Sequence, residues 1–227
     1  SVGYWDCCKP SCAWPDRGNV DQPIKACSAT GNFIDDALAK SSCDGGEASS
    51  CTDGQPFDVE PGLSMGFTAA AVGGVSGLKG DANCGQCFEL VWTDQQFDWG
   101  GGAHPSIVGK RHVVQVTNIG YDVSGDHSFD LQIPGAGQGQ FSGCVRQYGN
   151  AFSNGDFDCD NHYGGCSDAS GCSRLPQELQ AGCEWRYGHS YMWLKPGGRS
   201  NNPFVRFRRV QCPKELIDIT GSTPNDD

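Results

Sequence analysis

The chain reads HSFDLQIPGAG from His127 to Gly137. From Phe129 to Ile133 apolar and polar residues alternate strictly, which is the pattern of a half-buried strand. Asp130 lies on the polar face of this pattern, opposite the apolar residues that would face a core. The segment therefore predicts a short strand that presents a carboxylate and ends in a glycine-containing loop.

Further strands are predicted on both sides of this one. Residues 88–92 and 112–116 alternate in part, and residues 204–210 form the clearest late strand. Residues 1–66 are rich in loop-forming residues, so we expect strands to begin near residue 67. Residues 150–172 are expected to form a disulfide-stapled surface loop, and residues 176–181 a short helix.

The composition agrees with this pattern of short strands and long loops. The 227 residues include 33 Gly and 12 Pro, and only 37% are hydrophobic. Such a balance favours an all-β barrel core with large connecting loops over a helical bundle. No internal repeat and no Pro/Ser/Thr-rich linker divides the chain, so we expect one domain over residues 1–227 and no separate binding module.

Cysteine usage indicates the compartment. There are 14 Cys, an even number, which is typical of an oxidised, secreted protein with disulfides worth roughly 2–4 kcal/mol each. A zinc site is the alternative, because Cys84 and Cys87 form a C-x-x-C pair. No second C-x-x-C or His pair at the usual spacing completes such a site, so disulfides are favoured and no metal or other cofactor is expected.

Charge and hydropathy exclude several classes of partner. The formal net charge of −11 would repel nucleic acid. The apolar runs are far shorter than the ~20 residues that span a bilayer, so no membrane partner is expected. No signal-peptide pattern opens the sequence, and we therefore expect the mature form of a secreted protein. Nothing in the pattern predicts an oligomer, so a monomer is expected.

A second carboxylate lies in an unusual N-terminal segment. Residues 4–14 read YWDCCKPSCAW, in which closely spaced cysteines would hold the backbone rigidly around Asp6. Tyr4, Trp5 and Trp14 flank this acid, and aromatic faces suit the apolar C–H faces of sugar rings. The alternative is an ordinary loop whose aromatic residues belong to the core.

Asp6 and Asp130 suggest acid–base chemistry. A general acid needs a raised pKa, which a partly apolar setting on a strand can supply; a solvated Asp on an outer face is the alternative explanation of the same pattern. Paired carboxylates suit glycoside hydrolysis. Other chemistries are less well supported, because there is no G-x-S-x-G elbow and Gly100–Gly102 lacks the Lys of a phosphate loop. His112, at a strand start, is expected to be structural.

These two segments resemble glycoside hydrolase family 45. The resemblance rests on Tyr4–Cys12 and Ser128–Gly135, with further similarity at Cys84–Leu90, Cys183–Arg186 and Val210–Pro213. It implies a six-stranded double-psi β-barrel with long disulfide-stapled loops, a few short helices and an open groove for a β-1,4-glucan. The implied function is a secreted endo-β-1,4-glucanase (cellulase) that inverts configuration.

The resemblance also implies roles for individual residues. Asp6 matches the general base, and Asp130 matches the general acid. Asp122 best matches a third, assisting acid, with Asp126 as the alternative in the same loop. The expected substrate-binding aromatic residues of the groove are Tyr4, Trp14 and Tyr163.

The disulfide pairing is a further implication. By similarity the expected pairs are Cys7–Cys144, Cys8–Cys43, Cys12–Cys84, Cys27–Cys51, Cys87–Cys212 and Cys172–Cys183, which leaves Cys159 and Cys166 to pair with each other. One bridge common in the family is missing, because its two positions are Gly85 and Ser222 here.

Two non-catalytic classes are the alternatives. An expansin-like, wall-loosening glucan-binding protein would share the barrel and the acid-bearing strand, but it would typically lack the base at Asp6. In a disulfide-rich defence protein of barwin type, the two acids would have no catalytic role. Fold alone does not decide among them.

Overall fold

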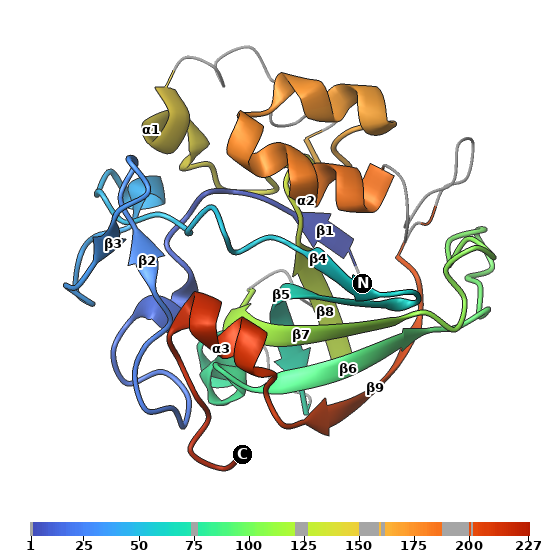
Figure 1. The fold of residues 1–227 in the computed structure, drawn as a ribbon, viewed down its shortest axis with the longest axis horizontal. Coiled ribbons are helices and arrows are strands. Elements are labelled where there is room, and N and C mark those ends of the chain that lie inside the picture. The colour runs from blue at the N-terminus through green and yellow to red at the C-terminus, as the bar shows by residue number, and fades with distance from the viewer. Residues whose placement is uncertain are drawn as a thin grey trace.

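The computed structural model describes residues 2–73, 77–120, 127–149, 159, 162–187, 200 and 202–227 (Figure 1). Most of its regular structure is β-strand, and the expected all-β class with a few short helices is confirmed at this level. The strands are β1 Val2–Tyr4, β2 Ala26–Cys27, β3 Phe33–Ile34, β4 Phe57–Glu60, β5 Leu63–Val72, β6 Cys87–Trp92, β7 Arg111–Asn118, β8 His127–Gln132 and β9 Val205–Val210.

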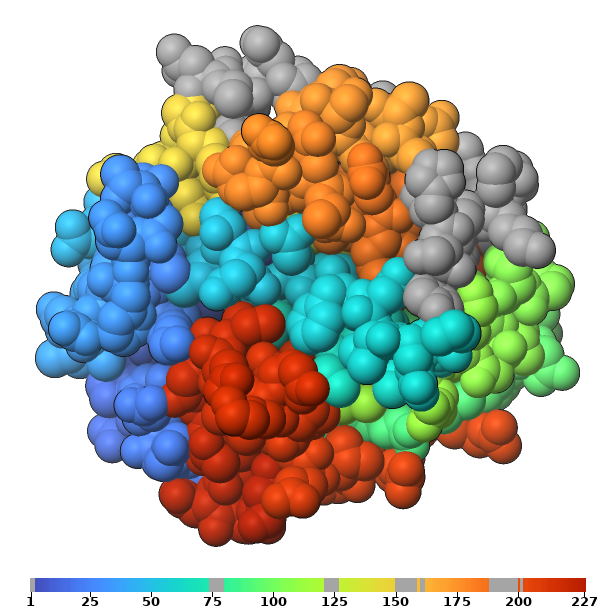
Figure 2. All heavy atoms as spheres, viewed as in Figure 1, coloured from blue at the N-terminus to red at the C-terminus, as the bar shows by residue number. Residues whose placement is uncertain are grey.

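The helices are short. The α-helices are α1 Cys144–Tyr148, α2 Gln177–Tyr187 and α3 Lys214–Thr220, and the 3-10 helices are η1 Ser11–Ala13, η2 Ser42–Asp44, η3 Gly77–Asn83 and η6 Ala169–Arg174. Figure 2 shows α2 and η6, in orange, covering the upper part of one face, with β4 in cyan below them. No helix in the described ranges combines the length and the apolar character needed to cross a membrane.

One sheet contains most of the strands. Its neighbours follow the order β1-β8-β5-β7-β6-β9, and β4 pairs with β5 outside this path. The β1–β8 and β5–β7 pairs are parallel, whereas the remaining pairs are antiparallel. Among the described residues β1 and β9 lie at the two ends of the path and do not pair, so the hydrogen-bonded ring is open.

The sheet nevertheless curls around its core. The ring of Phe129 on β8 lies 5.2 Å from that of Phe207 on β9, although three strands separate β8 from β9 in the pairing order. Phe88 on β6 lies 5.6 Å from Phe129 and 6.1 Å from Phe207, so the three rings meet edge to face. The inward faces of distant strands therefore share one apolar interior.

Four predicted strands and the predicted helix are found. Residues 88–92 lie in β6, residues 112–116 in β7, and residues 204–210 largely in β9. Residues 129–132 belong to β8, which starts earlier, at His127. The helix predicted at residues 176–181 begins α2 and continues to Tyr187.

The expectation that strands begin near residue 67 is wrong. Strand β1 occupies Val2–Tyr4, and β5 begins at Leu63. A strand of three residues is too short to show alternation, and β1 exists because β8 supplies its parallel hydrogen-bonding partner. The sequence gives no signal for the start of β5. This strand is buried on both faces, so its apolar and polar residues do not alternate.

All 14 cysteines are oxidised in the structure, and they form the same seven pairs that the family resemblance implies. The two positions of the missing bridge also adjoin one another. A Cβ atom placed on Gly85 would lie 3.8 Å from Oγ of Ser222. The buried amide of Gln115 donates to the carbonyl oxygens of Gly85 and Ser222, at 3.1 and 2.9 Å. Hydrogen bonds therefore join the two segments where a disulfide is absent.

His112 is fully buried in the core, as a structural histidine should be. Its Nδ1 lies 2.8 Å from Oγ of Ser64, and its ring lies between Trp92 and Trp185, at centroid distances of 5.9 and 4.9 Å. Burial lowers the pKa of His112 to about 3, because the charged imidazolium would lose its hydration. The side chain is therefore neutral at pH 7.

Candidate active site

A hollow of about 210 Å³ contains both carboxylates predicted to act together. Asp6 reaches it from the segment after β1, and Asp130 reaches it from β8. The remaining lining is Tyr4, Cys8, Lys9, Ser11, Ala69, Asn118, Ile119, Gly120, Gln138, Gly139, Gln140 and Phe141. Residues far apart in the sequence thus meet in one concave site.

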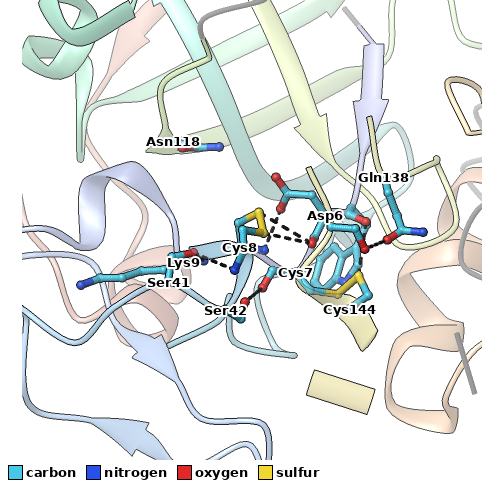
Figure 3. The surroundings of a disulfide bond; sticks show 12 residues. Asp6, Cys7, Cys8, Lys9, Ser41, Ser42, Asn118, Gln138 and Cys144 are labelled. Carbon is cyan, nitrogen blue, oxygen red and sulfur yellow. Dashed lines mark hydrogen bonds between the residues drawn. A yellow bond between two sulfur atoms is a disulfide. The ribbon is translucent and has the colours of Figure 1, made fainter. Parts of the chain in front are cut away.

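The carboxylate of Asp6 is oriented by a tight local turn. Cys7 adopts a φ of 58°, a left-handed conformation that is costly for a residue with a side chain. This conformation turns the backbone N–H of Cys8 back toward Asp6, and that N–H donates to Oδ1 at 2.9 Å. Figure 3 shows the resulting position of Asp6 between Asn118 and Gln138 in that view. The strained turn therefore fixes the direction of the acid.

Covalent and polar contacts hold this turn in place. The Cys7–Cys144 disulfide ties it to the start of α1, and Cys8–Cys43 ties it to η2. The Ser42 hydroxyl donates to the carbonyl of Cys7 at 2.9 Å, and the Gly143 N–H donates to the carbonyl of Asp6 at 2.7 Å. A side chain at position 143 would collide with the Ser42 hydroxyl, so Gly143 permits this close approach.

Asp130 is held by the sheet. Its backbone pairs with Ala69 of β5 and with Val2 of β1, so β8 has a neighbour on each side. The flanking Phe129 and Leu131 are buried in the core, which directs the intervening Asp130 toward the opposite face. The Thr68 hydroxyl also donates to the carbonyl of Asp130 at 2.9 Å. The position of this acid thus follows from the strand register.

Asn118 connects the two segments, and the sequence analysis missed it. At the end of β7, Asn118 is in register with Ala69, which is itself in register with Asp130. Its Nδ2 donates to the hydroxyl of Tyr4 at 3.1 Å, and its Oδ1 accepts from the N–H of Ser11 at 2.9 Å and from the Ser11 hydroxyl. An amide that ends a buried strand is a signal that could have identified it.

The predicted aromatic residues differ in their relation to the hollow. Tyr4 lines it. Trp14 is not part of the lining but contacts the lining residue Lys9, whose Nζ is 3.5 Å from the Trp14 ring centroid. Tyr163 is 76% exposed, and it packs against His162, whose carbonyl accepts from the N–H of the lining residue Gly139. It therefore lies beside the rim of the hollow.

Another exposed ring in the lining, that of Phe141, was missed by the sequence analysis. It follows a Gly- and Gln-rich run with no periodic pattern, so nothing in the sequence distinguished it from other loop residues.

Lys9 is the single cation in the described lining, and its ammonium group binds backbone carbonyls of the protein itself. Its Nζ donates to the carbonyls of Ala37 and Ala39, at 2.7 and 2.9 Å. Burial lowers the pKa of Lys9, and the charge of Asp36 opposes this effect. The hollow therefore offers carboxylates, amides and aromatic faces, which suit a neutral, hydroxyl-rich ligand and proton transfer.

Two predicted acids cannot be placed. Asp122 and its alternative Asp126 lie outside the described residues, which stop at Gly120 and resume at His127. Gly120 lines the hollow.

The described residues contain one close group of possible metal ligands, Cys166, Cys172 and Cys183. All three sulfur atoms belong to disulfides, so none is the thiolate that binds zinc.

Comparisons with known proteins agree with the geometry. A family model described as glycosyl hydrolase family 45 matches residues 1–223. The chain is 41% identical over 213 residues to an endoglucanase of Cryptopygus antarcticus, covering 94% of this chain and 83% of that protein. It is 36% identical over 222 residues to an endoglucanase of Phaedon cochleariae, covering 96% of this chain and 80% of that protein.

A fungal relative is longer than this chain. The chain is 39% identical to endoglucanase 1 of Mycosarcoma maydis over 234 residues, covering 99% of this chain but only 53% of that protein. Among solved structures, a cellulase from the Antarctic springtail Cryptopygus antarcticus superposes with a TM-score of 0.81 at 37% identity. That match covers 100% of this chain and 96% of the cellulase.

Proposed function

The chain belongs to glycosyl hydrolase family 45, and on this premise we propose that it is an endo-β-1,4-glucanase acting with inversion on cellulose and related glucans. The observation that carries the proposal is the meeting of Asp6 and Asp130 in one hollow. Relatives named endoglucanase, from an animal and a fungus among others, support the same activity.

In this mechanism Asp6 is the general base. It takes a proton from a water molecule, which attacks the anomeric carbon of the sugar ring from the face opposite the leaving group. The N–H of Cys8, which donates to Oδ1, stabilises negative charge on this carboxylate. The disulfide-clamped turn keeps the base in one orientation through the reaction.

Asp130 is the general acid in the same mechanism. It gives its proton to the departing O4, so the bond breaks without producing a free alkoxide. An inverting pair needs carboxyl groups roughly 6.5–9.5 Å apart, so that a water fits between base and sugar. An acid on a strand and a base on a clamped turn can maintain such a separation.

The finer architecture is also part of the proposal. We infer a six-stranded double-psi β-barrel, because β8, the neighbour of the end strand β1, already contacts β9 at the other end through Phe129 and Phe207. An open groove would cross this barrel at the hollow, with Tyr4, Trp14 and Tyr163 as platforms for sugar rings. Asp122 would assist from the loop after Gly120, with Asp126 as the alternative. Residues 1–227 would act as one catalytic domain.

The surroundings in which the enzyme works follow from the cysteines. Seven disulfides persist only in an oxidising compartment, which supports secretion. A soluble or fibrous glucan outside the cell would then be the substrate. We propose that the enzyme acts on it as a monomer and without a metal or other cofactor.

Proton NMR of cellohexaose during digestion tests the proposal. Fresh α-anomer at the new reducing ends is expected, because inversion of a β-linkage produces the α-configuration. An enzyme-free sample of a freshly dissolved single anomer of the product measures the rate of mutarotation over the same time. Fresh β-anomer would show retention and would make one carboxylate a nucleophile, contrary to the mechanism. Absence of cleavage would favour the expansin-like alternative.

A further inference from the structure

The connection between β6 and β7 forms a structured projection at the end of the sheet. Figure 1 shows it in green beyond the joined ends of these strands, and Figure 2 shows its atoms at the right-hand edge of the molecule. Within it Gln96 pairs with Gly102, and Phe97 exchanges backbone hydrogen bonds with Gly101 and Gly100. A tight turn therefore carries Trp99 at its tip.

Trp99 packs against neighbouring residues although it is exposed. Its indole stacks on Phe97 at a centroid distance of 4.9 Å and an angle of 17°, and Phe97 lies 4.2 Å from Phe204. A side chain at Gly101 would collide with the indole, so the glycine makes room for it. Yet 59% of Trp99 remains exposed. The ring is oriented by its neighbours without being buried by them.

A hollow of about 560 Å³ lies in the same projection. Its lining is Asp94, Gln96, Gly100, Gly102, Ala103, His104, Pro105 and Val108. The described part of this lining contains no Lys or Arg, which disfavours an anionic ligand. Its polar groups, a carboxylate, an amide and an imidazole, are the kinds that bind neutral hydroxyl groups.

His104 is prepared to donate a hydrogen bond. Its backbone N–H is anchored on Oγ of Ser200 at 2.8 Å, and its Nδ1 accepts the backbone N–H of Ser106 at 3.2 Å. The Ser106 hydroxyl also lies 2.9 Å from Nδ1, and in the tautomer in which Nδ1 accepts both contacts the ring hydrogen is on Nε2. Within the described ranges no partner accepts from Nε2. Asp94, exposed in the same lining, supplies an acceptor.

The projection is remote from the candidate active site. It precedes Arg111 at the start of β7, whereas Asn118 ends the same strand and lines the other hollow. At roughly 3.3 Å per residue these ends are about 23 Å apart. The two hollows share no lining residue.

We propose that Trp99 and the adjacent hollow form a second glucan-binding site, separate from the site of cleavage. The indole would stack on the C–H face of a glucose ring, while His104 and Asp94 would bind hydroxyl groups at its edge. The choice of β-1,4-glucan as ligand rests on the proposed function. Such a site would hold a neighbouring stretch of polymer and raise the local concentration of substrate.

Binding to insoluble cellulose tests the second site. The measurement uses Asp130→Asn enzyme, so that cleavage does not alter the surface during the experiment. Adding Trp99→Ala should weaken binding roughly three- to tenfold, as expected for one lost aromatic stack. Adding Trp99→Phe instead should keep binding close to that of the Asp130→Asn parent, because the flat face remains. Equal binding by the Trp99→Ala protein and its parent would overturn the proposal.

Kinetics of otherwise wild-type enzyme provide the second measurement. Trp99→Ala should leave kcat/KM on cellohexaose within about twofold, and it should slow hydrolysis of cellulose at low polymer loading. Thermal unfolding of each variant checks that the fold is intact. An equal loss on cellohexaose and cellulose in a folded variant would place Trp99 in the cleavage site and overturn the inference.

The two proposals fail in different ways. If wild-type enzyme does not cleave cellohexaose, the proposed function is wrong, but the cellulose-binding comparison still reports on Trp99. If cleavage occurs and Trp99→Ala binds cellulose normally, only the second site is wrong.

Discussion

Two regions bring a carboxylate to the same hollow, and different forces hold them. Asp6 lies in an irregular segment, where a strained Cys7 and the Cys7–Cys144 and Cys8–Cys43 disulfides fix its orientation. Asp130 lies on β8, which contains no cysteine and is held by β1 and β5. A segment without a hydrogen-bonded ladder needs covalent constraint to keep a side chain in one place, whereas a strand between two partners does not.

The largest expected effect comes from removing either carboxylate. Asp130→Asn should lower kcat on cellohexaose by about 10²–10⁴-fold while preserving oligosaccharide binding, because the acid acts mainly in the transition state. Asp6→Asn should cause a comparable loss, although its amide oxygen can still accept the Cys8 N–H and so preserve the turn. Initial rates and calorimetric titration of each variant provide the measurements.

Either residue can fail this test separately. If Asp130→Asn keeps more than about a tenth of wild-type activity, it is not the general acid. If Asp6→Asn still turns over, another base is present, and Asp122 is the first candidate.

A smaller effect should separate the two ways of holding a carboxylate. Replacing Cys8 and Cys43 with Ser removes one clamp beside Asp6 and should cost about 2–4 kcal/mol of unfolding free energy. It should also lower kcat/KM roughly tenfold at a temperature where the variant is folded, because the base loses its fixed orientation. Urea unfolding and kinetics on cellohexaose measure the two effects.

The matched control removes a disulfide away from the hollow. Cys87–Cys212 joins β6 to the segment before α3, and neither cysteine lines the hollow. Replacing both with Ser should lower stability by a similar or larger amount and leave kcat/KM of the folded enzyme nearly unchanged. Equal kinetic losses in the two double variants would show that the Cys8–Cys43 clamp has no special relation to Asp6.

The same contrast explains what could be predicted from the sequence. Alternation around Asp130 identified β8, because Phe129 and Leu131 are buried in the core whereas Asp130 between them is partly exposed. The pairing of Val2–Tyr4, which places Asp6 just beyond it, with distant β8 has no local signal, since β1 is only three residues long. Family resemblance, rather than any pattern, supplied the role of Asp6 and the disulfide pairs.

Tertiary contacts account for what was missed. The place of Asn118 beside Asp130 follows from the register of β7, β5 and β8, which the sequence does not give. Its hydrogen bond to Ser11 also joins residues that are 107 positions apart. The contact of Phe97 with both Trp99 and Phe204 likewise joins segments that no periodicity relates. The alternation of apolar and polar residues predicted several strands of the sheet, but it carries no information on contacts between loops.

Acidification should lower the free energy of unfolding through the buried side chain of His112. The pKa of His112 is about 3 in the folded protein and near 6.5 when unfolded, so below pH 6.5 the unfolded state binds the extra proton. The stability due to neutral His112 is complete above pH 6.5 and is lost as pH falls toward 3. The loss at pH 5 should be about 2 kcal/mol.

The variant His112→Gln isolates this contribution. Because other groups also titrate, the informative quantity is the difference in unfolding free energy between wild type and variant, measured from pH 8 to pH 4. That difference should shrink on acidification, since only the wild type has the histidine. A constant difference over this range would mean that His112 does not control the acid response.

The smallest effect should come from Asn118, which ties the clamped segment to the sheet. Asn118→Ala removes the donor to the Tyr4 hydroxyl and the acceptor for Ser11. If about 1 kcal/mol of transition-state stabilisation is lost, the net worth of one such hydrogen bond, kcat/KM on cellohexaose should fall roughly fivefold. Tyr4→Phe removes the other side of the first contact and should cost less, because the ring remains.

A double-mutant cycle shows whether Asn118 acts through Tyr4. If it does, Asn118→Ala combined with Tyr4→Phe should lose less activity than the product of the single losses, because both changes remove one hydrogen bond. The remote variant Trp99→Ala is the control, and its small effect should combine independently with Tyr4→Phe. Full additivity of Asn118→Ala and Tyr4→Phe would instead mean that the amide acts on the hollow directly.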